Sequence, residues 1–375
     1  MNCPLSKICG GCKYRDIDDN EYQEVKTKNF LRTLSSIKST SYRVNSPHFI
    51  SDGSRRRATF AFEFKKKHLI LGFNKEASSQ IVDVNKCPLL TDNINKVLPK
   101  VRGLIEAICN ETTTVKQGKK LIAQSVNSGD VFVCEASNGI DIVLEFDADL
   151  SLNHRMIVSE IIGTDASIIR VSHRRKANEE AETIVEKTKP FIKVGKYEVY
   201  IPAGTFLQPS EGGQRALGSL VVQYLKDVKG KVADLFCGVG TFSYLFASNQ
   251  GLQITAIDSS NQLLKGFQES INKNQISNIK VINKNLFKYP LDSNELKDFS
   301  AVVIDPPRAG AKAQCEELAK AQNQPPIIVS ISCNPNTFVN DANILIEGGY
   351  ILQEVTMVDQ FIYSNHSELV ACFTK

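Results

Sequence analysis

The amino-acid sequence predicts an α/β fold, in which a Rossmann-like domain follows a β-rich domain. Three observations predict it. From about residue 196, apolar strand-like runs alternate with helix-like stretches, which is typical of a doubly wound sheet. Before that point, residues 43–195 contain short strand-like runs separated by turn signals. The length of 375 residues gives room for two ordinary domains. We therefore predict a division into residues 1–195 and 196–375.

The composition is that of a soluble globular protein, with 42% hydrophobic and 23% charged residues. The net charge of +4 identifies no partner, but its distribution is uneven. Residues 1–195 carry 30 Lys and Arg against 24 Asp and Glu, whereas residues 196–375 carry 15 against 17. The first half is therefore the better place for a phosphate backbone. The sequence shows neither a signal-peptide pattern nor a membrane-spanning apolar stretch, so we expect a cytoplasmic protein without a membrane partner.

Four cysteines form a candidate metal site in the first half. Cys3, Cys9 and Cys12 have the spacing C-x5-C-x2-C, and Cys87 is followed by a proline. Ten cysteines in a chain without an export signal indicate metal binding or catalysis for some of them. Three closely spaced cysteines with one distant Cys-Pro resemble iron–sulfur ligation more than a zinc ribbon, whose ligands come as two pairs. We predict an iron–sulfur cluster, with zinc or unligated thiols as alternatives.

The strands expected in the first half include one rich in aromatic residues. It carries Phe60, Phe62 and Phe64 on one face and lies between two basic runs, at 55–57 and 65–67. Such a strand could grip RNA phosphates and stack a base, or it could be an edge strand with its aromatic side chains in the core. A further basic run at 172–176 is expected in a loop. The expected strands are 58–64, 68–74, 129–135 and 140–146.

In the second half, four of the expected strands end in residues whose side chains can bind a ligand or take part in a reaction. Phe236, Asp258, Asp305 and Cys333 lie at or directly after these strand ends. Ligands of doubly wound sheets bind beyond the carboxyl ends of the strands, so we expect these residues to meet at one edge. The expected strands are 232–236, 253–258, 279–283, 301–305 and 327–332, and the expected helices are 212–226, 260–274 and 336–346.

The first of these strands leads into a glycine loop. Asp234-x-x-x-Gly238-x-Gly240 lets a nucleotide-like ligand approach the backbone, in dinucleotide enzymes as well as in methyltransferases. Asp258 ends the next strand, where a carboxylate can accept hydrogen bonds from both ribose hydroxyls. The alternative role of Asp258 is to cap the helix that follows.

Two later motifs separate the alternatives. Asp305-Pro306-Pro307-Arg308 ends in arginine, whereas the related motif of amino-group methyltransferases ends in an aromatic residue. Cys333 follows one strand later, against the first turn of a helix, where the helix dipole and unpaired N–H groups favour a thiolate. Carbon 5 of a pyrimidine is a poor nucleophile until a thiolate adds at carbon 6. That chemistry needs a cysteine and a base. The rival readings are an amino-group methyltransferase and a non-catalytic iron–sulfur sensor that binds RNA.

Taken together, these motifs resemble the family of AdoMet-dependent RNA uracil-5-methyltransferases. The resemblance covers nearly the whole chain and extends to a short motif at 366–368. It implies a Rossmann-like methyltransferase domain, a [4Fe–4S] cluster held by the four cysteines, Cys333 as nucleophile and Glu368 as the base. The residues implied in AdoMet binding are Gln208, Phe236, Asp258, Asn285 and Asp305.

The sequence departs from the family pattern at two places. Asp258 stands where the family commonly has Glu, and the run 361–365 lacks the proline expected before the base.

Because the first cysteine lies at position 3, we expect no nucleic-acid-binding β-barrel before the cluster. This arrangement is most similar to the 23S ribosomal RNA enzymes of the RlmC (RumB) type. Structured RNA is therefore the expected partner, with ribosomal RNA favoured and tRNA as the alternative.

Overall fold

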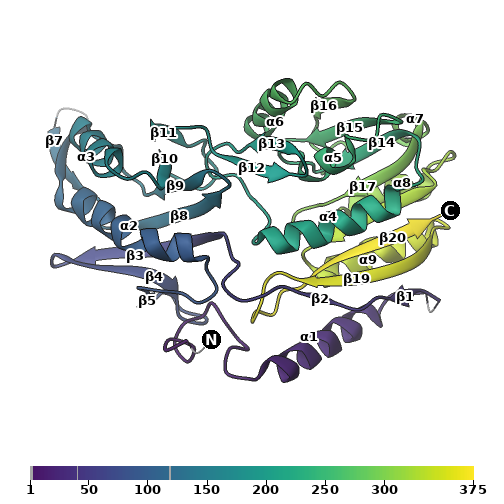
Figure 1. Ribbon diagram of the computed structural model, residues 1–375, viewed down its shortest axis with the longest axis horizontal. Coiled ribbons are helices and arrows are strands. Elements are labelled where there is room, and N and C mark those ends of the chain that lie inside the picture. The colour runs from purple at the N-terminus through teal and green to yellow at the C-terminus, as the bar shows by residue number, and fades with distance from the viewer. Residues whose placement is uncertain (1–2, 40, 118–119) are drawn as a thin grey trace. The chain divides into compact units, whose positions relative to one another are not determined.

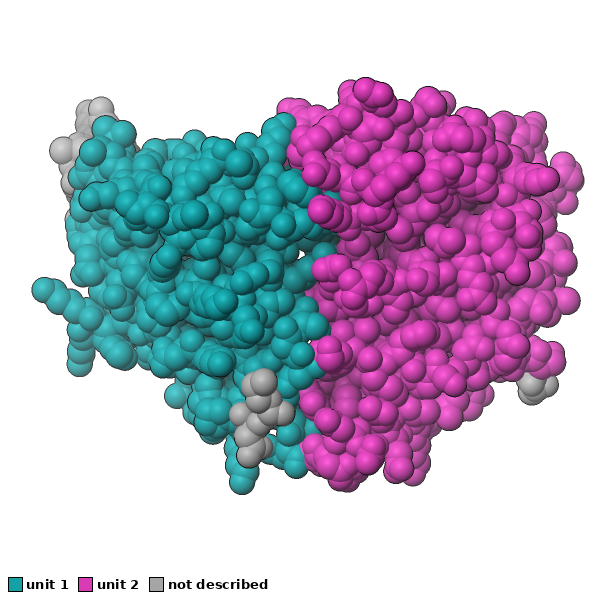
Figure 2. Space-filling view, viewed as in Figure 1, with its two compact units in different colours: residues 1–16, 52–192, 201–207 teal, residues 17–51, 193–200, 208–375 magenta. Residues whose placement is uncertain are grey.

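The computed structural model describes residues 3–39, 41–117 and 120–375 and divides into two compact units. Unit 1 comprises residues 1–16, 52–192 and 201–207, and unit 2 comprises residues 17–51, 193–200 and 208–375, as Figure 2 shows in two colours. This division differs from the simple boundary expected at residue 195. Residues 17–51 belong to unit 2 because Phe30, Leu34 and Ile37 are buried in its core. No helix within the described residues has the length and apolar character needed to cross a membrane.

Unit 1 is built on a seven-stranded sheet in the order β11-β10-β9-β8-β3-β4-β5 (Figure 1). Apart from the parallel pair β9 and β10, neighbouring strands run antiparallel. Helices α2 and α3 contribute side chains such as Val101 and Val158 to the apolar core on this sheet. The elements are β3 (Arg57–Lys65), β4 (His68–Asn74), β5 (Ile81–Asp83), α2 (Asp92–Asn110), the hairpin β6 (Thr112–Gln117) and β7 (Lys120–Ser125), β8 (Ser128–Ala136), β9 (Gly139–Glu145), α3 (Leu152–Gly163), β10 (Ile168–Arg174) and β11 (Glu182–Glu186).

This sheet shows where the aromatic strand and the basic run at 172–176 lie. The aromatic residues Phe60 and Phe62 are fully buried in β3, so this strand offers no stacking face from them. The basic run at 172–176 is not simply a loop, because its first three residues end strand β10 and pair with β9. Strand β10 continues here because Ser172 and His173 are buried against the neighbouring strands.

Unit 2 contains the doubly wound sheet that the alternation of strands and helices predicted. Its main order is β1-β19-β20-β18-β17-β14-β15-β16, with β2 beside β19 (Figure 1). The strands run parallel except β20, which lies antiparallel between β18 and β19. The strands are β1 (Arg43–Val44), β2 (His48–Phe49), β14 (Gly230–Leu235), β15 (Leu252–Asp258), β16 (Ile279–Asn283), β17 (Phe299–Ile304), β18 (Ile327–Ser332), β19 (Ile351–Asp359) and β20 (Glu368–Thr374).

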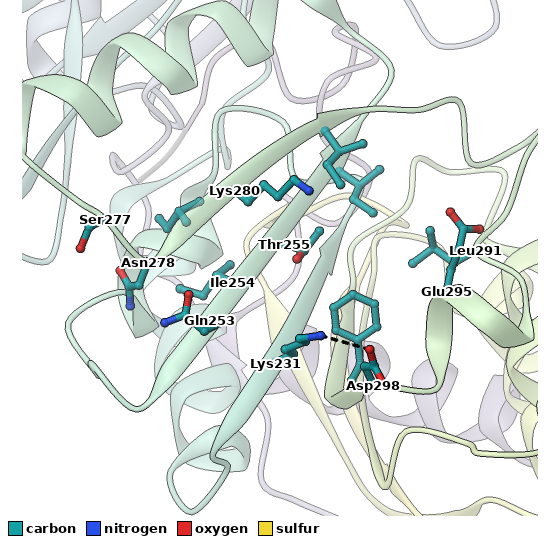
Figure 3. Close-up of a pocket in the computed structure, with 14 residues that line it drawn as sticks. Lys231, Gln253, Ile254, Thr255, Ser277, Asn278, Lys280, Leu291, Glu295 and Asp298 are labelled. Atoms are coloured by element: carbon teal, nitrogen blue, oxygen red, sulfur yellow. Dashed lines mark hydrogen bonds and ion pairs between the residues drawn. The ribbon is translucent and has the colours of Figure 1, made fainter.

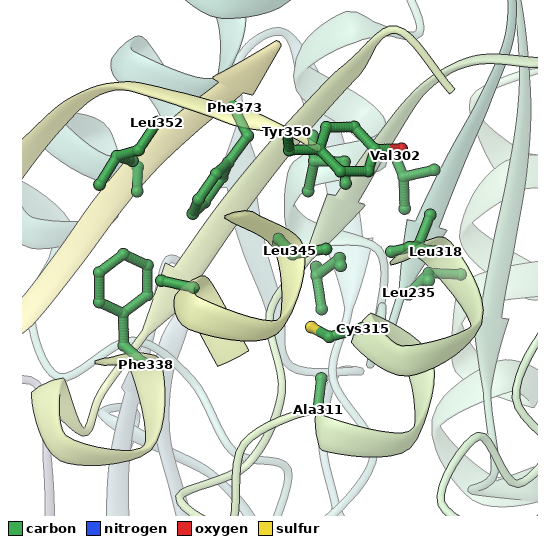
Figure 4. Close-up of a cluster of buried hydrophobic side chains, with 14 of the residues drawn as sticks. Leu235, Val302, Ala311, Cys315, Leu318, Phe338, Leu345, Tyr350, Leu352 and Phe373 are labelled. Atoms are coloured by element: carbon green, nitrogen blue, oxygen red, sulfur yellow. The ribbon is translucent and has the colours of Figure 1, made fainter. Parts of the chain in front are cut away.

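Helices cover both faces of this sheet. On one face, α1, α8 and α9 enclose a continuous apolar cluster, in which Phe338 and Leu345 lie near Phe373 and Tyr350 (Figure 4). Helices α4, α5 and α6 pack against other parts of the same sheet. A two-stranded sheet of β12 (Phe191–Val194) and β13 (Tyr197–Tyr200) precedes this part of the chain. The helices are α1 (Asp19–Leu34), α4 (Glu211–Leu225), α5 (Thr241–Phe246), α6 (Asn261–Lys273), α7 (Ser293–Leu296), α8 (Lys312–Lys320) and α9 (Pro335–Glu347).

The register of the sheet fixes where each strand delivers its last residue. Leu235 pairs with Ile257 and with Ile304, so Phe236, Asp258 and Asp305 leave the sheet at one level. Strand β20 runs the opposite way and begins where β18 ends, because Ser332 pairs with Leu369. The antiparallel strand therefore brings Glu368 to the same edge.

Candidate active site

The glycine loop after β14 has the backbone that a close approach to a ligand requires. Phe236, Gly238 and Gly240 all have positive φ angles, of 62°, 56° and 85°. A Cβ at Gly240 would lie 2.5 Å or less from the ring of Phe267, so glycine is required there by packing as well as by conformation. The Phe236 ring lies beside that of Phe287, with centroids 5.2 Å apart. The positive φ angles, the packing of Gly240 on Phe267 and the contact of Phe236 with Phe287 together fix the conformation of the loop.

Asp258 supports this loop and does not cap the next helix. Its Oδ2 accepts a hydrogen bond from Gly238 N at 3.0 Å, and its Oδ1 accepts one from Ser260 N at 2.9 Å. The helix cap is Ser260, whose Oγ accepts from Leu263 N at 3.3 Å. Each carboxylate oxygen has two acceptor positions, so Asp258 keeps capacity for further donors.

Two carboxylates, that of the fully buried Asp234 and that of the partly exposed Asp305, lie at the strand ends. Burial raises the pKa of Asp234 to about 7, although Asp234 Oδ2 accepts hydrogen bonds from Ser243 N at 3.1 Å and from Ser243 Oγ at 2.5 Å. Among the described residues, Asp234 Oδ1 has no hydrogen-bond partner. Burial also raises the pKa of Asp305 well above its usual range, and the charges of Glu368 and Asp234 raise it further. A cation placed among these groups would be strongly stabilised.

Cys333 lies half-buried at the end of β18, next to these carboxylates. Burial, followed by the negative charges of Glu368 and Asp305, raises its pKa to about 11, while Arg308 lowers it. The expected thiolate is therefore not favoured in the ligand-free protein. The helix N-terminus is present as expected, with Asn334 as cap and Pro335 in the first turn of α9, but burial and two carboxylates outweigh it.

Glu368 is buried at the start of β20 and is held by a glutamine that the sequence did not reveal. Gln360 Nε2 donates to Glu368 Oε2 and, at 2.5 Å, to Gln208 Oε1. All three side chains are at most 7% exposed. Gln360 thus joins the expected base to the expected AdoMet-binding residue. Its position one residue after a strand gave no signal, because a glutamine there is ordinary.

Arg308 and His366 form a polar pair at the exposed side of this site. Arg308 Nη2 lies 3.0 Å from His366 Nδ1, and the Arg308 carbonyl accepts a hydrogen bond from Asn334 Nδ2 at 3.1 Å. Burial and the neighbouring positive charges of Arg308 and Lys26 lower the pKa of His366. The neutral imidazole can therefore accept from the guanidinium.

Asn285 lies in the loop after β16, where its Oδ1 accepts hydrogen bonds from Phe287 N at 3.1 Å and from Lys288 N at 3.2 Å. It shapes the turn that presents the half-exposed Phe287 beside Phe236. The structure therefore gives Asn285 a local role in the turn, on the same loop as an aromatic side chain that adjoins the glycine loop.

The four expected cluster cysteines share one neighbourhood in unit 1. Burial raises the pKa of Cys12 to about 12; Arg15 lowers it, and the other three thiols raise it further. Cys9 Sγ accepts a hydrogen bond from Gly11 N at 3.4 Å. Within the described residues, however, no group of three or more His, Cys, Asp or Glu side chains meets the geometry of a metal site. The thiols are thus neighbours without forming a closed coordination shell.

A pocket of about 460 Å³ lies elsewhere on the sheet of unit 2 (Figure 3). It is lined by side chains of β14, β15 and β16, including Thr255 and Lys280, and by the ion pair of Lys231 with Asp298 at 3.1 Å. None of the residues that the sequence singled out lines it. Ligands of such sheets bind beyond the carboxyl ends of the strands, so the candidate active site is the strand-end cluster.

The fold and this cluster of strand-end residues define a Rossmann-like methyltransferase. Residues 19–375 match the model of the tRNA (uracil-5-)-methyltransferase family, and the chain belongs to that family. It is 33% identical over 372 residues to an uncharacterized RNA methyltransferase of Agrobacterium fabrum, covering 99% of this chain and 83% of that protein. It is 32% identical over 374 residues to one of Brucella melitensis, covering 100% and 84%.

A solved structure has the same fold over the whole chain. The tRNA (uracil-54, C5)-methyltransferase of Pyrococcus abyssi, in complex with S-adenosyl-L-homocysteine, superposes with a TM-score of 0.72 at 20% identity. The likeness covers 100% of this chain and 87% of that one. The enzyme class expected from the sequence, an AdoMet-dependent RNA uracil-5-methyltransferase, is thus confirmed by family membership.

Proposed function

We propose that this protein methylates carbon 5 of a uridine in structured RNA through a transient covalent adduct. Cys333 is the nucleophile that forms the adduct, and Glu368 is the base that removes the carbon 5 proton. The observation that carries this proposal is the meeting of one thiol and two carboxylates at a single sheet edge, where Glu368 and Asp305 both act on the pKa of Cys333. A nucleophile and a base from neighbouring strands are what addition at carbon 6 and proton removal at carbon 5 require.

AdoMet fits the residues beside this pair and supplies the methyl group. The fully buried carboxylate of Asp234, which has one unpartnered oxygen among the described residues, and the partly exposed carboxylate of Asp305 suit a nearby positive charge. The glycine loop gives backbone access, and Asp258 has acceptor capacity for ribose hydroxyls. We assign Gln208, Phe236 and Asn285 to the same pocket as proposed contacts.

In this mechanism, the Cys333 thiolate forms a bond from Sγ to carbon 6 of the uracil. Carbon 5 then carries the electron pair that would take up the methyl group of AdoMet, whose methyl–sulfur bond would break to leave S-adenosyl-L-homocysteine. Glu368 removes the carbon 5 proton, the bond from carbon 6 to Sγ breaks, and the thiolate is regenerated. Because the pKa of Cys333 is about 11 in the ligand-free protein, the nucleophile needs positive charge nearby, and Arg308 supplies part of it. The target base must leave its stack to reach Cys333.

Two substitutions test the assignments. Cys333→Ala should abolish transfer of tritium from labelled AdoMet to RNA, whereas near-normal transfer would favour an amino-group methyltransferase instead. Glu368→Gln should still form the adduct but release it slowly, so that a protein–RNA species appears on a denaturing gel. Absence of that species would remove Glu368 from the role of base.

We further propose that Cys3, Cys9, Cys12 and Cys87 hold a [4Fe–4S] cluster with a structural role. The support is their spacing and their shared neighbourhood. Closing the long loop between Cys12 and Cys87 would stabilise unit 1. Anaerobically purified protein should contain iron and sulfide, about four of each per chain. Stoichiometric zinc without iron would refute the cluster.

For the target, we propose a uridine in structured RNA, with 23S ribosomal RNA as the first candidate because the sequence motifs resemble those of the ribosomal RNA enzymes. The alternative is a tRNA uridine, which the description of the family and the Pyrococcus abyssi relative favour. Mass-spectrometric mapping of 5-methyluridine in ribosomal RNA and tRNA from a strain without the gene decides between them. Loss of the modification from tRNA alone would overturn the ribosomal target.

A further inference from the structure

A buried lysine from the first helix of unit 2 contacts the backbone of the segment that leads to Glu368. Lys26 in α1 is 2% exposed, and its Nζ lies 3.0 Å from Oδ1 of Asp359, which is fully buried. A buried ammonium group is unfavourable unless it is paired and hydrogen-bonded. Both conditions are met here, since Nζ also donates to two backbone carbonyls, of Ser364 at 2.9 Å and of His366 at 2.5 Å.

The two carbonyls belong to one segment, the connection between β19 and β20. It runs from residue 360 to 367, directly after Asp359 and directly before Glu368. Its two ends are fixed by the pairing of Val358 with Glu368 across the antiparallel strands. Its middle belongs to no strand, and the contacts of Lys26 fix the carbonyls of residues 364 and 366 there.

A tyrosine one turn earlier in α1 completes the network. The Tyr22 hydroxyl donates to Asp359 Oδ2 and accepts from Tyr363 N at 2.8 Å. Tyr363 has a φ of 57°, a conformation that a bulky residue adopts only when its surroundings impose it. Its hydroxyl donates to Asp19 Oδ1 at 3.1 Å, and its ring lies 4.9 Å from that of Tyr22. Helix α1 thus binds the segment at two backbone carbonyls, of Ser364 and His366, and at the backbone amide of Tyr363.

We propose that Lys26 is a positioning residue, which fixes the 360–367 segment so that Glu368 can remove the carbon 5 proton from the adduct. The segment carries Gln360, which donates to Glu368, and His366, which contacts Arg308. A shift of the backbone at residues 364–366 would move His366 together with its contact to Arg308 and would disturb the chain directly before Glu368. Cys333 lies on a different strand, so formation of the adduct should depend on Lys26 much less than its release does.

The test uses the full chain, tritium-labelled AdoMet and total RNA from a strain that lacks the gene. Because Lys26→Met alone would leave Asp359 buried without its partner, the variant is the double substitution Lys26→Met with Asp359→Asn, which keeps an acceptor for Tyr22. Tyr22→Phe is a second, milder variant. Lys28→Met is the matched control, because this lysine is exposed on the same helix. On a denaturing gel, tritium that migrates with protein reports the adduct, and tritium in free RNA reports product.

We expect the ratio of protein-bound to free tritium to rise at least tenfold in the double variant and at least threefold in Tyr22→Phe, and to stay unchanged in Lys28→Met. A purely structural role would lower both signals together and leave the ratio unchanged, which would overturn the proposal. This inference rests on the proposed function, and Glu368→Gln separates the two. If Glu368→Gln traps an adduct and the Lys26 variants do not, the positioning role fails alone; if Glu368→Gln traps none, the proposed mechanism fails as well.

Discussion

The contact between helix α4 and Gln360 gives a sharp test, because two adjacent glycines differ in what they face. Gly213 lies in the first turn of α4, and a Cβ there would lie 2.8 Å from the Cβ of Gln360, still closer to its Oε1, and 2.9 Å from Ser210 Oγ. At Gly212, a Cβ would meet only Ile50 at an ordinary 3.7 Å. We predict that Gly213→Ala slows release of the adduct and that Gly212→Ala does not.

The magnitude follows from the displacement that the methyl group requires. Ordinary contacts to a Cβ begin at 3.4 Å, so the backbone side of Gln360 must retreat by roughly half an ångström and its amide must rotate further. That movement breaks the hydrogen bond from Gln360 Nε2 to Glu368. A hydrogen bond to a charged group is worth about 1.5–3 kcal/mol, which corresponds to roughly a 10- to 100-fold slower step if Glu368 loses its position.

Both alanine variants gain helix propensity of up to about 1 kcal/mol, so they differ only in the contacts that the new methyl group meets. Urea denaturation should show Gly212→Ala as stable as the wild type or more so. The functional measurement is the decay of the protein–RNA adduct after a chase with unlabelled AdoMet. Equal decay rates in Gly212→Ala and Gly213→Ala would refute the idea that Gln360 positions the base.

Three further outcomes are expected. Because the pKa of Cys333 is about 11, its alkylation by iodoacetamide, followed by peptide mass spectrometry, should rise about tenfold per pH unit up to pH 9, and Arg308→Met should slow it; a plateau below pH 8 would contradict this. Burial raises the pKa of Asp341 to about 6, so the folded state binds a proton more tightly than the unfolded state does. Stability should therefore fall by about 2–3 kcal/mol as the pH rises from 4 to 7, and Asp341→Asn should flatten that slope in urea titrations. Gly240→Ala should cost about 2 kcal/mol or more in unfolding free energy because its Cβ meets the Phe267 ring; a loss below about 0.5 kcal/mol would contradict the packing argument.

Strands of the doubly wound sheet could be predicted because buried parallel strands are short apolar runs with clear ends. Strands β16 and β18 lie at the predicted residues, and β15 differs by one residue. The residues at the strand ends followed from the same reasoning, because the topology of such a sheet gathers them at one edge. This is why the sequence alone could predict that Cys333 and Asp305 lie at one edge of the sheet.

The placement of helix α1 could not be predicted in the same way. Its segment, residues 17–51, lies between two stretches of unit 1 in the sequence, and its role depends on a pairing of Lys26 with Asp359 that no local pattern encodes. The protonation of Cys333 also depends on more than its local sequence. A helix N-terminus is visible in the sequence, but the opposing effect of Glu368 depends on strand β20 running antiparallel, which only the tertiary structure reveals.

The discontinuous course of the chain through unit 2 affects any attempt to dissect the protein by truncation. A fragment that begins at residue 208 would contain most of the sheet but would lack Phe30 and Leu34, and so would leave an apolar surface open to solvent. It would also leave Asp359 without its lysine. Such a fragment should aggregate. A soluble catalytic piece would instead require residues 17–51 to be supplied in trans or joined by a designed linker.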